Sequence, residues 1–102
     1  MIFRNRFADV VSRQLDLFAS EEADGLLAEI AEMKARYDRA GRDDSEEAYG
    51  DYVLVVDATA EALGDMRDRF ARTLEGDDAV ERYEETFDRA ARKRWPELGM
   101  SL

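Results

Sequence analysis

The chain has 102 residues and a formal net charge of −10, from 25 acidic and 15 basic side chains, with 45% hydrophobic residues. This excess of negative charge repels phosphate backbones and anionic lipid, so we expect no nucleic-acid or membrane partner. Because the chain has no cysteine and no histidine, disulfides, thiolate nucleophiles, serine–histidine triads and zinc sites built from those side chains are excluded.

The first predicted helix covers residues 2–19. Apolar side chains recur there at three- and four-residue steps, which places them on one helical face. They are Phe7, Val10, Val11, Leu17 and Phe18. Gln14 lies on the same face, and we expect it to be hydrogen-bonded at a helix interface.

A second helix is predicted over residues 21–40. Ser20 has the character of an N-cap, because Glu21 and Glu22 follow it and place negative charge at the helix start. Basic residues precede Gly41 at the other end, which is typical of a helix C-terminus. The expected core face consists of Ala23, Leu26, Leu27, Ile30, Met33 and Tyr37.

The third predicted helix, residues 46–75, is the longest. Its apolar period runs from Tyr49 to Leu74 without a change of phase, so we expect Gly64 to be accommodated within one helix. The run Tyr-Val-Leu-Val-Val at 52–56 could form a buried strand by its β-branched content. No partner strand is predicted elsewhere, so the helical interpretation is favoured.

A fourth helix is predicted over residues 78–94, followed by a short tail after Pro96. Short connections should make successive helices antiparallel neighbours. The predicted fold is therefore all-α: a single domain, residues 1–102, that forms an up-and-down antiparallel bundle of three to four helices. Eight times an acidic residue is followed four positions later by arginine, as at Asp88 and Arg92, which predicts ion pairs within helices.

The apolar run 52–56 also predicts an interface. On a helix, Leu54 lies roughly opposite the stripe that contains Val53 and Val56, so either the chain's own bundle or a second copy must cover the far side. A third helix of about 45 Å beside a first helix of about 27 Å leaves length uncovered within one chain. We therefore expect a homodimer with Tyr52, Leu54 and Val55 at its interface, and a water-exposed Leu54 would count against this assembly.

Four carboxylates form a candidate Mg²⁺ site, since hard cations bind oxygen ligands and facing helices can supply them. They are Glu29, Glu32, Glu47 and Asp51. The alternative interpretation is an exposed acidic surface, because Glu32 and Asp51 project away from the apolar stripes.

Two stretches that contain these carboxylates are Ala-Glu-Ile-Ala-Glu at 28–32 and Ala-Tyr-Gly-Asp-Tyr-Val-Leu-Val at 48–55. Over residues 26–63 the chain resembles the MazG-type all-α nucleoside triphosphate pyrophosphohydrolases. The resemblance implies that Glu29, Glu32 and Asp51 bind Mg²⁺, which polarises a triphosphate while a coordinated water attacks. Alanine stands at positions 28 and 48, where the two motifs begin with other residues in that family.

The basic residues at the end of the fourth helix have two interpretations. Arg89, Arg92, Lys93 and Arg94 could bind an anion, or they could stabilise the terminal carbonyl groups of the helix. Trp95, which follows them, is a candidate anchor for a partner or a lid on the end of the bundle.

Two functions follow from these patterns. The first is a small acidic protein that acts by self-association or by binding an unidentified protein partner, without a cofactor. The second is an Mg²⁺-dependent nucleotide hydrolase. No run approaches the roughly 18 apolar residues of a membrane span, and residues 1–6 lack the apolar core of a signal peptide, so we expect a cytoplasmic protein.

Overall fold

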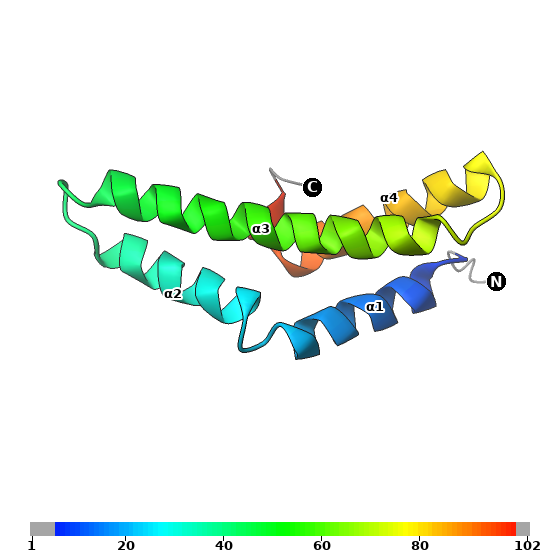
Figure 1. Cartoon of the computed structure of the whole chain (residues 1–102), viewed down its shortest axis with the longest axis horizontal. Helices are drawn as coiled ribbons and strands as arrows, with labels where there is room; N and C mark the ends of the chain where they lie inside the picture. Colours follow the sequence, from blue (N-terminus) through cyan, green and yellow to red (C-terminus); the bar gives the residue numbers. More distant parts are fainter. Residues whose placement is uncertain (1–5, 100–102) are drawn as a thin grey trace.

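The computed structural model describes residues 6–99, and this part of the chain is helical without any strand. Four α-helices follow one another, and a 3₁₀ helix comes after the last (Figure 1). Their bounds are Ala8–Glu21 for α1, Leu26–Arg39 for α2, Ser45–Ala71 for α3, Asp77–Arg94 for α4 and Pro96–Leu98 for η1. The predicted all-α bundle is confirmed. Within the described residues, no helix has both the length and the apolar character that crossing a membrane requires.

The third helix is continuous, as predicted. It runs for 27 residues and includes both the β-branched run 52–56 and Gly64, so the strand interpretation is wrong. A β-carbon at Gly64 would meet no atom nearer than Nη2 of Arg67, at 3.8 Å. No close contact therefore requires glycine at this position, and its only effect is to weaken the helix slightly.

The helix ends differ from the prediction at four places. Residues 6 and 7 form a turn before α1, while residues 2–5 lie outside the described part. Ser20 is not an N-cap, because α1 continues through it to Glu21, and α2 begins at Leu26 rather than at the predicted residue 21. The third helix ends at Ala71, four residues before the predicted end. Residues 96–98 form η1 rather than a tail, and Leu98 is fully buried.

Backbone hydrogen bonds replace the capping side chain that was predicted for α2. The carbonyl oxygen of Glu22 accepts hydrogen bonds from the N–H groups of Gly25 and Leu27, both at 3.1 Å. These two bonds provide acceptors for N–H groups at the start of α2 that have no partner within the helix, and no side chain caps the helix there. Glu22 and Asp24 therefore lie in the connecting turn, while Glu21 is the last residue of α1.

The helices α1 and α2 run in the same direction, one after the other, along the length of α3 (Figure 1). The expected antiparallel arrangement holds for α2 with α3 and for α3 with α4, but not for α1 with α2. The molecule is therefore elongated, with extents of 53 × 25 × 24 Å. We call α1, α4 and the C-terminal part of α3 the three-helix half, and we call α2 with the N-terminal part of α3 the hairpin.

The core lies mainly in the three-helix half, where Tyr83 and Phe87 of α4 are completely buried. The ring of Tyr83 packs against Phe7 at a centroid distance of 5.6 Å and against Phe70 at 4.7 Å. Its hydroxyl donates a hydrogen bond of 2.9 Å to Oε1 of Gln14, which confirms the predicted role of Gln14. Burial raises the pKa of Tyr83, so this hydroxyl keeps its proton at neutral pH.

The hairpin buries much less. Ile30 is the one buried residue of α2, and Leu26, Leu27 and Met33 are half-buried. Tyr37 and Ala23, which were predicted on the core face, are exposed, and so is Tyr49 of α3. In the hairpin, α2 and the N-terminal part of α3 each bury only the side that faces the other helix. The short η1 packs against only part of this pair, so no further helix covers the remaining sides.

Candidate functional site

The four candidate metal ligands do not converge. Asp51 and Glu47 of α3 both face Arg36 of α2, whose Nη1 lies 2.7 Å from Oδ2 of Asp51 and whose Nη2 lies 4.0 Å from Oε1 of Glu47. Glu29 and Glu32 are exposed elsewhere on α2. Residues 6–99 contain no group of three or more carboxylates that could hold a metal ion.

A guanidinium lies against two of the four carboxylates and no third carboxylate joins them within the described residues, so one chain offers no geometric support for an Mg²⁺ site. The arrangement instead joins the two helices of the hairpin through Arg36. The Arg36 and Asp51 side chains are 42% and 40% exposed, so their ion pair contributes at most about 1 kcal/mol to stability. The spacing of four between acidic residues and arginines predicts that Arg36 pairs with Glu32 on the same helix. It does not indicate the contact of Arg36 with Asp51 on the neighbouring helix.

A second ion-pair cluster joins α3 to α4 in the three-helix half. Arg67 is only one fifth exposed, and it donates hydrogen bonds to Asp68 at 2.9 Å and to Asp88 at 2.8 Å. Burial alone would lower the pKa of Arg67, but the hydrogen bonds to both carboxylates raise it, so the guanidinium is always charged. The predicted pairing of Asp88 with Arg92 is thus replaced by a contact between helices, and the cluster has a structural role.

Aromatic residues gather on the open side of the hairpin, and we call Tyr37, Tyr49 and Tyr52 the tyrosine surface. The rings of Tyr37 and Tyr49 lie 5.3 Å apart. Tyr52 lines a shallow pocket of about 290 Å³ together with Trp95 and Glu97, at the place where η1 meets the hairpin. Burial, followed by the negative charge of Glu97, raises the pKa of Tyr52. On this face of the hairpin, η1 covers only the region near Tyr52, and the other two tyrosines of the tyrosine surface lie beyond it.

The three predicted interface residues lie in different surroundings. Tyr52 and Val55 are half-buried and pack against the core of their own chain, whereas Leu54 is 67% exposed. The expectation that the apolar run is covered on all sides is therefore wrong within one chain. Around Leu54, the exposed residues one helical turn away are Gly50, Asp57 and Ala58, and Glu61 is exposed two turns away. A single leucine in such a polar face is common on protein surfaces and does not by itself indicate an interface.

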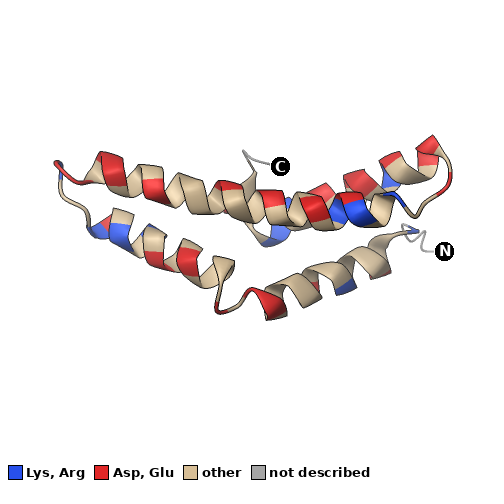
Figure 2. Cartoon of the chain, in the orientation of Figure 1, with Lys and Arg blue, Asp and Glu red and all other residues tan. Residues whose placement is uncertain are grey.

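Charge is distributed unevenly over the molecule (Figure 2). Acidic residues occur along all four helices, while α4 ends in the basic residues Arg92, Lys93 and Arg94. Trp95 comes next, and its ring packs against Phe18 of α1 at a centroid distance of 5.7 Å. Of its two predicted roles, the structure therefore supports a lid where α1 and α4 meet.

Comparison with models of protein families, with curated proteins and with solved structures yields no significant match. The resemblance to the MazG-type hydrolases therefore rests on the two sequence stretches at 28–32 and 48–55 alone.

Proposed function

We propose that the protein acts by association, and that a second copy docks on the tyrosine surface of the hairpin to form a homodimer. The observation that carries this proposal is the exposure of the aromatic pair, since Tyr37 is 37% and Tyr49 is 51% exposed. Aromatic side chains are enriched at the centres of protein interfaces, where they bury a large area with few rotatable bonds. Two hairpins that pack on this side would form a four-helix arrangement and cover both pairs of tyrosines.

The charges near each candidate face favour the tyrosine surface over Leu54. Glu97, Lys34 and Asp38 all act on Tyr52 electrostatically, and Lys34 forms an ion pair of 3.2 Å with Asp38, so a cation offsets part of the negative charge there. Leu54 instead has Asp57 and Glu61 beside it. Near a two-fold axis, each of these carboxylates would face its counterpart in the other copy, and such like-charge contacts are costly. The proposed interface thus keeps Tyr52 and leaves Leu54 outside.

The test is the mass of the protein in sedimentation equilibrium at micromolar concentration. We expect the dimer mass for the unmodified protein and the monomer mass for Tyr49→Glu, because a carboxylate in the centre of the interface would lose its hydration. Leu54→Glu is the matched control on the other side of α3, and it should remain dimeric. Circular dichroism checks that both variants keep the helical content of the unmodified protein.

Two results would count against the proposal. A monomer mass for the unmodified protein over the whole concentration range would show that the protein does not form a homodimer. Dissociation by Leu54→Glu, with Tyr49→Glu still dimeric, would place the contact on the outer face of α3 instead.

A further inference from the structure

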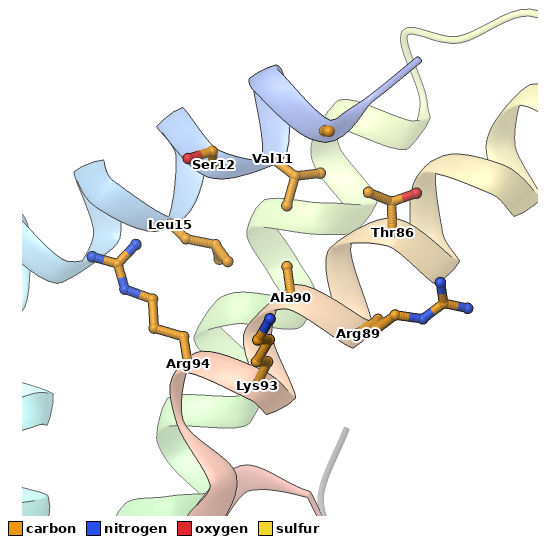
Figure 3. A pocket seen from close by; sticks show the side chains of 9 residues that line it. Val11, Ser12, Leu15, Thr86, Arg89, Ala90, Lys93 and Arg94 are labelled. Atoms are coloured by element: carbon orange, nitrogen blue, oxygen red, sulfur yellow. The ribbon is translucent and has the colours of Figure 1, made fainter. Parts of the chain in front are cut away.

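The helices α1 and α4 form the walls of a groove in the three-helix half (Figure 3). The groove has a volume of about 590 Å³ and is open on one side. Val11 and Leu15 of α1 lie at its base but are only 1% and 2% exposed, so the small residues Ala8, Ser12 and Ala90 form its accessible floor. Arg89, Lys93 and Arg94 of α4 line the groove as a basic rim, in which Arg94 extends toward α1 and Arg89 points away from Val11 and Leu15 (Figure 3). We call this feature the basic groove.

Two cations of this rim have no acidic partner in the described part of the chain. Arg94 donates to Oδ1 of Asp16 at 2.7 Å and lies over the ring of Trp95 at 5.2 Å. Arg89 and Lys93 form no ion pair within residues 6–99. Stabilisation of the helix end accounts for Lys93, which lies in the last turn of α4, but not for Arg89, which lies before it. The two are also one turn apart, where like charges repel each other.

We propose that the basic groove docks an acidic amphipathic helix of another protein. The apolar stripe of that helix would lie on Ala8, Ala90 and the aliphatic parts of the Arg89 and Lys93 side chains. Its carboxylates would pair with the charged ends of those two side chains. In a chain of net charge −10, most of the surface repels such a helix. A local basic rim would therefore attract it to this place and fix its orientation.

The shape of the groove favours a helix over a small amphiphile. The lining residues span Ala8 to Leu15 on one wall and Thr86 to Arg94 on the other, which is about two helical turns of roughly 5.4 Å each. The small residues Ala8, Ser12 and Ala90 allow another helix backbone to approach closely. Since the groove is open along its side, a small molecule would remain largely exposed there, whereas ligand pockets bury most of their ligand.

The basic groove and the tyrosine surface lie in different halves of the molecule and share no residue. The groove is formed by α1 and α4, and the tyrosine surface by α2 and α3. Docking in the groove therefore does not depend on the homodimer, and each proposal can fail without the other.

The probe is a fluorescein-labelled peptide of about 18 residues, with leucine at helical spacing and glutamate on the flanking positions. Fluorescence anisotropy at low salt should show saturable binding to the full chain, and added sodium chloride should weaken it because salt screens the ion pairs. The double variant Arg89→Glu/Lys93→Glu should bind about tenfold or more weakly. The double variant Arg42→Glu/Arg69→Glu makes the same change of net charge outside the groove, and it should bind within about twofold of the unmodified protein.

Four outcomes would overturn the proposal. They are no binding of the peptide, equal binding of a scrambled peptide of the same composition, an equal loss of affinity in the control double variant, and saturable binding of dodecanoate without binding of the peptide. A changed sedimenting mass of Arg89→Glu/Lys93→Glu would identify a second copy as the occupant and would also overturn it. Circular dichroism of each variant separates loss of binding from loss of fold.

Discussion

The hydrogen bond between Tyr83 and Gln14 joins α4 to α1 within the best-packed part of the molecule. The Tyr83 side chain has no exposed surface, so its hydroxyl depends on the single acceptor at 2.9 Å. An unpaired buried hydroxyl loses its hydration without compensation. Gln14 is only half-buried, and its amide can still reach water. Removing Gln14 and removing the Tyr83 hydroxyl should therefore lower the free energy of unfolding by different amounts.

At the residue scale we predict an asymmetric effect of removing the two partners. Gln14→Leu should lower the free energy of unfolding by about 1–3 kcal/mol, because it leaves the Tyr83 hydroxyl unpaired. Tyr83→Phe should cost less, about 0.5–1.5 kcal/mol, and the double variant should recover part of the loss caused by Gln14→Leu. Urea denaturation of the four proteins measures all three values. Equal and additive losses would show that this bond does not couple α1 to α4.

For the helices, the regular apolar periodicity was sufficient to predict all four. The local capping patterns did not predict several of their ends correctly. The sequence around Ser20 has the features of an N-cap, but the same residues are also compatible with a continuing α1, and packing of Phe18 in the core extends that helix. Leu98 follows Pro96, where a tail was expected, yet its burial depends on α3 and α4 meeting at that point. Such long-range contacts leave no local signal.

The candidate sites show the same limit. The sequence correctly placed Gln14 at a helix interface, because an amide within an apolar stripe needs a partner. It could not show that Asp51 faces Arg36, since that contact depends on how α2 is rotated against α3. It also assigned Tyr37 and Tyr49 to the core, because periodicity identifies an apolar face but does not show whether another helix covers it. The wall of the basic groove contributed by α1 was not identifiable for a similar reason.

We predict that alanine stabilises α3 at Gly50. A β-carbon there would meet no atom within 4 Å, so Gly50→Ala should raise the free energy of unfolding by about 0.5–1 kcal/mol through helix propensity. Gly76 is the contrasting position, because its φ of 91° is a conformation that side chains disfavour. Gly76→Ala should therefore lower the stability. Thermal and urea denaturation of both variants measure the effects, and destabilisation by Gly50→Ala would show that its exposed face is covered in solution.

At the scale of the whole molecule, the two halves differ in how completely they are packed. The three-helix half contains the aromatic cluster and the Arg67 ion pairs, while the hairpin buries one residue of α2. The tyrosine surface proposed as the dimer interface follows from this difference, since the hairpin lacks a covering layer on the side of its tyrosines. A catalytic role for the hairpin carboxylates has no such geometric support, because Arg36 lies between Glu47 and Asp51.

We therefore predict that Mg²⁺ together with a nucleoside triphosphate leaves the Tm unchanged. A ligand present at a hundred times its Kd stabilises a protein by about 2.7 kcal/mol, which shifts the Tm of a domain of this size by about 10 °C or more. Differential scanning fluorimetry across a panel of nucleotides detects a shift of that size easily. A shift that requires both components, or release of pyrophosphate, would restore the hydrolase interpretation.

The elongated shape determines how the protein travels through solution. Its radius of gyration is 16.0 Å, whereas a compact chain of this length has a value of about 13 Å. Friction rises with such elongation, so a monomer should have a larger Stokes radius and elute earlier in gel filtration than a sphere of equal mass. An early elution volume is therefore no evidence of a dimer for this molecule, and a mass obtained at sedimentation equilibrium, which does not depend on shape, is required.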